Sequence, residues 1–194
     1  MNILLLFFIV AGVQPKEVAV LIKTKGSVII VKSGKIIRAK RGNLLNEGDE
    51  IRTGKDGFAL IKYLNKGAII QLKKNSSISF PSSQKSFIFN RVKLFFGEII
   101  SIIKGKRFEV ETPNAVAAVK GTKFIVGVYG DTTYLDVTEG EVTFSSKGGE
   151  ETFGPGESAR CIGDNPPEMI HRKKNIIIEF KRGGKAKKLE IMVK

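Results

Sequence analysis

The chain has 194 residues, of which 42% are hydrophobic and 27% charged, and its formal net charge is +14. This length and hydrophobic content fit one folded domain with a substantial core and exclude a largely disordered chain. The single cysteine, Cys161, excludes an intrachain disulfide, so the fold must rely on its core.

Residue usage predicts an all-β fold. Isoleucine and valine together number 39 against 12 leucines, and β-branched residues favour strands. The 21 glycines are dispersed at the spacing of turns, and no long stretch has helical periodicity. We therefore expect two related units of short, twisted antiparallel strands, packed as a double-layer or solenoid-like β domain, with a C-terminal β-hairpin.

The first fifteen residues have the character of a secretory leader. Residues 3–13 are eleven consecutive apolar positions, too few to cross about 30 Å of hydrocarbon and suited to the core of a signal peptide. We expect residues 1–15 to be a signal peptide with an approximate cleavage position, and the mature protein to be exported to the periplasm or the extracellular space. An uncleaved anchor or a buried first strand is the alternative.

Short strands and tight turns follow from residue 17 onward. The segments EVAVLIKT and GSVIIVK predict strands, Ser33-Gly34 predicts a hairpin turn, and KIIRA predicts the returning strand. Asp56-Gly57 is a type I′ turn signal before the strand FALIKYL. A turn at residues 65–67 should then lead to AIIQLKKNSSISF.

A recurring pattern indicates internal duplication. A glycine opens a strand-like run in GSVIIV at residue 26, in GEIISI at 97 and in GEVTF at 140. The possible repeat units are residues 26–80 and 97–162, joined by PSSQKS and the strand FIFNRVKLFF.

The most informative stretch is TPNAVAAVKGTKFIVGV, residues 112–128. Pro113 lacks an amide hydrogen, so the preceding strand RFEVET should end there or lie at a sheet edge. Gly121 interrupts an apolar run, which marks a bulge or a close backbone approach, and side chains alternate after it. We interpret Lys120-Gly121-Thr122 as a corner of a β fold; the alternative is a small anion-binding cradle.

This stretch resembles the signature TP-x-A-x-x-x-x-(R/K)-G-T-x-F of FecR-type domains, extracytoplasmic all-β modules first known from iron-dicitrate signalling. The structural signature falls on Thr112, Pro113, Lys120, Gly121, Thr122 and Phe124. The resemblance runs from Gly26 to Ile162 and implies a FecR-like β domain over residues 16–162. Two small departures are the Asn-Lys-Gly-Ala turn at 65–68 and a lysine where arginine is commoner.

The resemblance carries an expectation about signalling. Signalling FecR proteins are implied to carry a cytoplasmic sigma-factor-binding domain before a membrane span, and a further segment after the β domain. Only two residues precede the hydrophobic stretch here, so we expect a stand-alone form without direct control of a sigma factor.

Residues 163–194 lie beyond the resemblance and form a basic extension. The segment GDNPPE predicts a turn or linker, and the apolar runs at 176–180 and 189–193 around Gly183-Gly184 predict a closing hairpin. The hairpin either adds strands to the domain or belongs to a detached basic tail.

Charge is distributed unevenly along the chain. Residues 16–93 carry a net charge of +12, residues 94–162 carry −3, and residues 163–194 carry +5. The first block predicts a surface for an anionic partner, which for an exported protein is a glycan, a lipid surface or an envelope protein rather than nucleic acid. The candidate contacts are Lys23, Lys32, Lys62 and Lys73. The alternative is a solvated surface that keeps the protein soluble.

Residues suited to catalysis or metal binding are sparse. No nucleophile-elbow, zinc-protease or P-loop motif is present, so we expect no enzyme activity and no cofactor. Cys161 fits a small apolar strand residue, and His171 has no partner at zinc-ligand spacing. The spacing of one acidic cluster favours a solvated strand edge over a calcium site; its members are Asp131, Asp136, Glu139 and Glu141.

Two functions remain open from the sequence. The first is a non-enzymatic binding or regulatory module of the cell envelope that contacts a protein or glycan partner. The second is a structural envelope component that is held against an anionic surface by its basic face.

Overall fold

The computed structural model describes the following residues: 16–64, 67–81, 90–105, 107–171, 174–182 and 185–193. Every regular element in them is a β-strand, which confirms the all-β prediction. A helix that could cross a membrane is not found in this part of the chain. The expected signal peptide, residues 1–15, lies outside the described residues.

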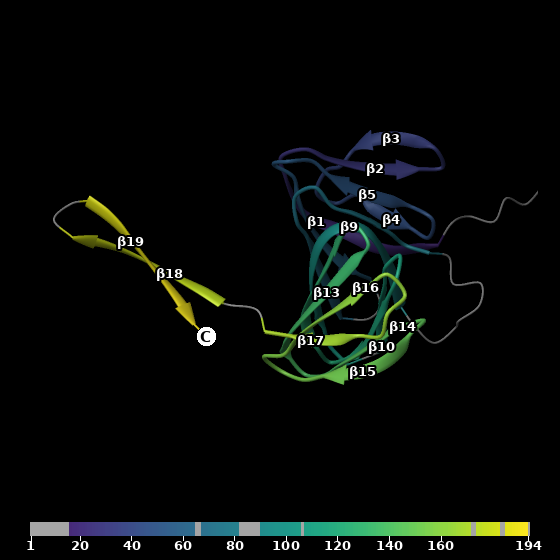
Figure 1. The fold of residues 1–194 in the computed structure, drawn as a ribbon. Helices are drawn as coiled ribbons and strands as arrows, with labels where there is room; N and C mark the ends of the chain where they lie inside the picture. The colour runs from purple at the N-terminus through teal and green to yellow at the C-terminus, as the bar shows by residue number, and fades with distance from the viewer. Residues whose placement is uncertain are drawn as a thin grey trace, which may run out of the picture.

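One group of strands forms an antiparallel sheet, which we call sheet A (Figure 1). Its strands in spatial order are β4 (Leu44–Asn46), β1 (Glu17–Lys25), β6 (Phe58–Tyr63), β7 (Ala68–Leu72), the second half of β9 (Asn90–Ile103), β12 (Lys123–Tyr129), β13 (Thr132–Glu139), β16 (Ser158–Ile162) and β17 (Glu168–Ile170).

The remaining strands of the main body form sheet B. Their spatial order is β3 (Lys35–Arg38), β2 (Val28–Lys32), β5 (Glu50–Thr53), β8 (Ser77–Ser79), the first half of β9, β10 (Arg107–Glu111), β11 (Val116–Lys120), β14 (Val142–Ser146) and β15 (Gly149–Phe153). Strands β9 and β10 are parallel, and the other pairs of this sheet are antiparallel.

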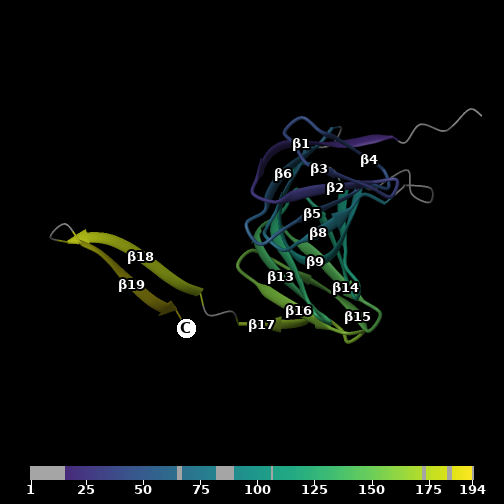
Figure 2. The same ribbon diagram turned by 90° about the horizontal axis from the view of Figure 1, so that it is seen from above.

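The C-terminal extension forms the expected hairpin. Strands β18 (Lys174–Arg182) and β19 (Lys185–Val193) pair with each other as a separate two-stranded sheet. Figures 1 and 2 both draw this hairpin apart from the main body. It therefore does not extend either of the larger sheets.

Strand β9 joins the two sheets. Its first half pairs with β8 and β10 in sheet B, and its second half pairs with β7 and β12 in sheet A. Its buried side chains lie at even positions as far as Leu94 and at odd positions from Gly97, because Phe95 and Phe96 are both exposed. This one-residue change of face is a β-bulge, which redirects the strand from one sheet to the other.

The core lies between the two sheets. Inward-facing side chains of both form one hydrophobic cluster, and burying each large one contributes about 1.5–3 kcal/mol. The ring of Tyr63, from sheet A, lies 5.4 Å from that of Phe108, from sheet B, in an edge-on arrangement. The Tyr63 hydroxyl donates to the Arg91 carbonyl at 3.0 Å, and burial raises the pKa of Tyr63 above its usual value. The two sheets are thus joined by a polar contact as well as by packing.

One turn prediction is confirmed and another is wrong. Ser33 and Gly34, at φ +47° and +78°, form the predicted hairpin turn between β2 and β3. The type I′ turn predicted at Asp56-Gly57 is absent, since neither residue has a positive φ and β5 and β6 lie in different sheets. Glycine is still required at 57, because a Cβ there would lie 2.3 Å from the carbonyl oxygen of Ser27.

Element boundaries differ in two further places from those that the sequence pattern predicts. Gly26 and Gly140 precede β2 and β14 as expected, whereas Gly97 lies inside β9 and opens no strand. The sequence also did not predict β17, which forms by pairing with β16. The relation between the two proposed repeat units stays a prediction.

Candidate functional site

The turn between β10 and β11 carries the Thr-Pro-Asn-Ala run. Strand β10 ends at Glu111, before Pro113, as a residue without an amide hydrogen favours. The Thr112 amide donates to the Ala115 carbonyl at 2.8 Å, and the Ala115 amide donates back to Oγ1 of Thr112 at 2.9 Å. Thr112 is 5% exposed. Its reciprocal bonds close the turn and fix its shape.

Asn114 ties this turn of sheet B to sheet A. Its Nδ2 lies 2.9 Å from the carbonyl oxygen of Asp131, 3.1 Å from that of Cys161 and 3.0 Å from that of Gly163. Its Oδ1 accepts a hydrogen bond from the Thr133 hydroxyl. The sequence pattern missed Asn114, because the signature leaves this position variable. An asparagine directly after a turn proline was the available signal.

Lys120, Gly121 and Thr122 form the corner where the chain passes from β11 in sheet B to β12 in sheet A. Gly121 has φ +71°, and an added Cβ would meet nothing within 4 Å, so backbone conformation rather than close approach calls for glycine. Thr122 is buried, and its hydroxyl donates to the Glu141 carbonyl at 3.0 Å. The hydroxyl of the alternative anion cradle thus faces the protein's own backbone. Phe124, further along, is buried in the core.

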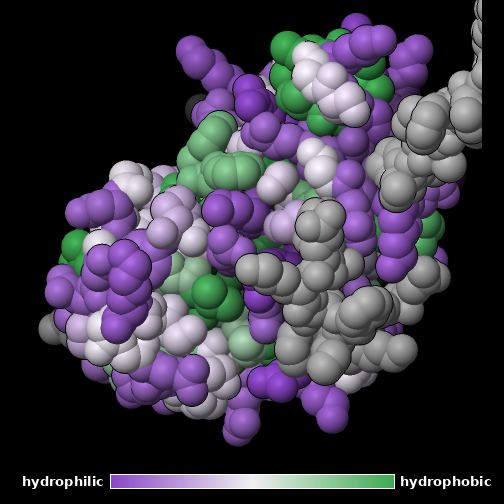
Figure 3. Space-filling view, turned by 90° about the vertical axis from the view of Figure 1, so that its right-hand side faces the viewer, coloured by the Kyte–Doolittle hydropathy of each residue, from purple (hydrophilic) through white to green (hydrophobic). Residues whose placement is uncertain are grey.

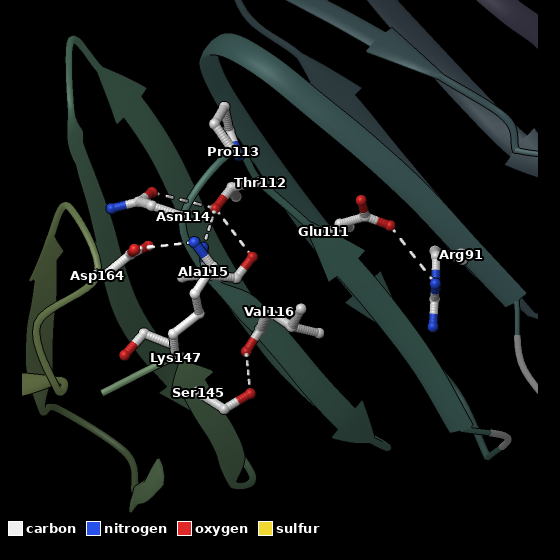
Figure 4. Close-up of a pocket in the computed structure, with 11 residues that line it drawn as sticks. Arg91, Glu111, Thr112, Pro113, Asn114, Ala115, Val116, Ser145, Lys147 and Asp164 are labelled. Atoms are coloured by element: carbon white, nitrogen blue, oxygen red, sulfur yellow. Dashed lines mark hydrogen bonds and ion pairs between the residues drawn. The ribbon is translucent and has the colours of Figure 1, made fainter. Parts of the chain in front are cut away.

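A groove of about 390 Å³, lined by both polar and apolar groups, opens beside the Thr112 turn (Figure 4). The turn residues, 112–116, form one part of it. Arg91 of β9, Ser145 of β14 and Asp164 after β16 complete its lining with their neighbours. The groove thus brings together strands from both halves of the chain.

Charges around the groove are paired with one another. Arg91 contacts Glu109 at 2.9 Å and Glu111 at 3.4 Å, and Lys93 contacts Glu111 at 3.1 Å. On the other side, Lys147 lies 2.8 Å from Asp164. Lys147 and Asp164 are exposed, whereas Glu109 and Glu111 are part-buried, and every pair keeps at least one solvent-exposed partner, so each adds only about 1 kcal/mol to stability. The groove therefore suits a neutral or zwitterionic polar ligand, which can exchange these contacts for its own.

The described residues offer little for catalysis. No group of three or more histidine, cysteine or carboxylate side chains among them could hold a metal ion. Cys161 is fully buried on β16, and burial raises the pKa of its thiol to about 11, so the thiol is protonated at neutral pH and a poor nucleophile. His171 is exposed after β17. The arrangement can bind a ligand, and no reacting group converges on the groove within this part of the chain.

The acidic cluster noted in the sequence is spread along β13. Asp131 lies in the turn before this strand, and Glu139 is its last residue. Asp136 accepts a hydrogen bond from the Ser158 hydroxyl at 2.5 Å, and Glu139 lies 3.7 Å from Lys123. These carboxylates therefore do not surround a common point.

The four lysines proposed for an anionic partner do not share one face. Lys23 on β1 and Lys62 on β6 are exposed on neighbouring strands of sheet A, and Lys73 directly follows β7 in the same sheet. Lys32 instead ends β2 in sheet B, where its Nζ lies 3.3 Å from the buried carboxylate of Asp49. Three of the four therefore remain together as a candidate surface.

Comparison with known proteins identifies the fold. Residues 49–143 match the FecR protein family. Two crystal structures of a candidate anti-sigma factor from Parabacteroides distasonis ATCC 8503 share the fold, each with a TM-score of 0.53 and 21% sequence identity over 62% of this chain. The chain spans 57% of the length of those proteins. No curated protein matches the sequence.

Proposed function

Because residues 49–143 form a FecR-type domain, we propose that the protein is a non-enzymatic, exported regulatory module of the cell envelope that binds a protein or glycan partner. The leader-like residues 1–15 support export. The description of the solved relative as a candidate anti-sigma factor supports a regulatory role.

The groove beside Thr112 carries this proposal. Its floor is fixed by the bonds between Thr112 and Ala115 and by the contacts of Asn114 with sheet A, so binding orders few groups. Its charges are exposed or part-buried pairs, and none is fully buried, so a partner can displace these contacts without leaving a fully buried charge alone. A polar peptide loop or a sugar fits this chemistry.

Filling the groove should abolish partner binding. Ser145→Arg places a long side chain in the groove from the outer face of β14, and we expect at least a tenfold loss of bound partner. The measurement is capture from envelope extract by the purified protein, followed by mass spectrometry. Protease treatment of the extract separates protein partners from glycans.

Thr143→Arg is the matched control for this test. Thr143 lies two residues earlier on β14, on the same outward side, and does not line the groove. It should capture the same partner as the unchanged protein. Equal capture by both variants, with unchanged melting temperatures, would remove the groove from the proposal.

The alternative function is a structural envelope component held to an anionic surface. Lys23, Lys62 and Lys73 on sheet A favour it, because neighbouring strands can array positive charge along a face. Ile69 and Ile102 lie opposite each other on this sheet, and Ile102 is 36% exposed, so apolar contact can accompany the charges.

Reversing these three lysines to glutamate should weaken binding to anionic vesicles at least about tenfold at low salt, since several weak, screened contacts act together. Lys32 is left unchanged, because a glutamate there would face the buried Asp49. Binding is titrated at two salt concentrations and should fall steeply as salt rises.

Reversal of Lys55, Lys120 and Lys147, which are exposed elsewhere, controls for net charge and should have a smaller effect. Binding that ignores both salt and the first set of reversals would exclude this alternative.

A further inference from the structure

Within the part of the chain that the structure describes, sheet B ends in two free edges at opposite ends of the main body. Strand β3 is the last strand at one end and β15 the last at the other, at the top and bottom of the body in Figure 1. An edge strand presents unpaired backbone donors and acceptors, which another strand can pair with. The sheet therefore offers two docking edges.

The β3 edge is the more apolar. Its four residues are all exposed, and Ile36 and Ile37 are 66% and 40% exposed. Figure 3 shows hydrophobic side chains gathered at the top of the molecule, the end that carries β2 and β3 in Figure 1. The Ala39 amide donates to the Val28 carbonyl of β2. In an antiparallel hairpin, the backbone groups of successive residues face the partner strand and the free edge in turn, so the amides of Ile36 and Arg38 face the free edge.

The β15 edge has the same geometry with the opposite charge. Ser146 pairs with Gly149 across a two-residue turn, so the outward backbone groups belong to Glu150 and Thr152. Glu150, Glu151 and Thr152 are all exposed. The two edges are thus built alike, one basic and one acidic.

Charge decides which edges can pair. Two β3 edges would bring together two basic strands, each carrying Lys35 and Arg38. Two β15 edges would bring together two acidic strands, each carrying Glu150 and Glu151, and both arrangements cost free energy through repulsion between like charges. In the antiparallel register that pairs the outward backbone groups, Arg38 lies opposite Glu150 on the same face. Residues 16–93 carry a net charge of +12 and residues 94–162 carry −3. At longer range, these opposite charges also favour an approach in which the β3 edge of one copy faces the β15 edge of another.

We propose that copies of this protein associate head to tail, with the β3 edge of one copy paired to the β15 edge of the next. Each contact extends sheet B from one molecule into its neighbour. Because the two surfaces are different, the assembly is an open chain or a ring rather than a two-fold dimer. The strands are short, so the contact is weak, with a dissociation constant of about 10 µM to 1 mM.

Charge exchange between the edges tests this pairing. Full-length coding sequences carrying K35E/R38E, E150K/E151K or all four changes are expressed, and the purified proteins are examined by sedimentation velocity across this concentration range. Each double variant should lose association at least about tenfold, and the four-residue exchange should restore it. An equimolar mixture of the two double variants should also associate.

An unchanged protein that stays monomeric at all concentrations would overturn the proposal, as would failure of the exchange and the mixture to restore association. Association that survives both double variants would assign the contact to another surface, such as the β18–β19 hairpin.

Ile36→Pro tests the backbone part of the contact. It removes an amide that faces the free edge and leaves the β2–β3 hydrogen bonds intact, so folding should persist while association is lost. Ile36→Thr keeps that amide and should retain most of the association. Equal association of the proline and threonine variants, at matched melting temperatures, would rule out strand pairing.

Discussion

Gly97→Ala should destabilise the protein by at least about 3 kcal/mol, a large share of the stability of an ordinary domain. A Cβ at this position would lie 2.1 Å from Oγ of Ser76 and 2.5 Å from the carbonyl oxygen of Asn75. Ser76 cannot easily move, because its Oγ accepts the Glu98 amide at 2.9 Å. The φ of +86° adds conformational strain for any L side chain. Urea unfolding of the Gly97→Ala variant and of the unchanged protein measures the difference in the free energy of unfolding.

Gly42→Ala separates strain from overlap. Gly42 has φ +87°, and a Cβ there would meet nothing within 4 Å, so only the conformational cost of about 1 kcal/mol should appear. Gly121→Ala, at φ +71° and with the same open space, should behave in the same way. A Gly97 variant no less stable than these two would show that β9 does not pack against Ser76 as described.

Asn114→Ala should cost about 2–3 kcal/mol. The change removes the amide that serves the carbonyls of Asp131, Cys161 and Gly163, and these three exposed or part-buried hydrogen bonds contribute about 1 kcal/mol each. The turn would also lose its attachment to sheet A. Thermal and urea unfolding provide the measurement.

Asn114→Asp identifies the cause. The side chain has the same shape but presents oxygen to those carbonyls, so it should destabilise at least as much as alanine. Asn43→Ala is a matched control, since Oδ1 of Asn43 accepts the local amide of Lys40 at 2.7 Å on an exposed turn, and it should cost about 1 kcal/mol or less. A well-tolerated aspartate would mean that Asn114 acts by filling space.

The fold class followed from the sequence because its signals are local. β-branched residues, glycines at turns and a hairpin signal such as Ser33-Gly34 each act within a few residues. Asp56-Gly57 gives the same kind of signal but joins strands of different sheets, where a glycine is needed for close approach to Ser27. Local pattern does not reveal which sheet a strand enters, so this turn and the continuity of β9 were missed.

The candidate site was predictable only in part. Thr112 and Pro113 were identified because a proline lacks the amide hydrogen that a central strand needs, which is a local signal. Arg91 and Asp164 reach the groove because strands that are distant in the sequence pair with each other. The spacing of these residues along the chain does not predict that they lie close together. The division of the four lysines between sheets has the same origin, since Lys32 and Lys62 have similar local sequences but enter different sheets.

The sharing of β9 has a consequence for the order of folding. The strands before residue 90 form two partial sheets, one ending at β7 and the other at β8. Both β7 and β8 pair next with β9, so each partial sheet stays incomplete until β9 is in place. Because β9 is one covalent segment, its arrival completes both layers together, and its loss opens both. A chain interrupted before β9 would present two unpaired edges at once, a condition that promotes aggregation. We therefore expect the two layers to melt as a single cooperative unit.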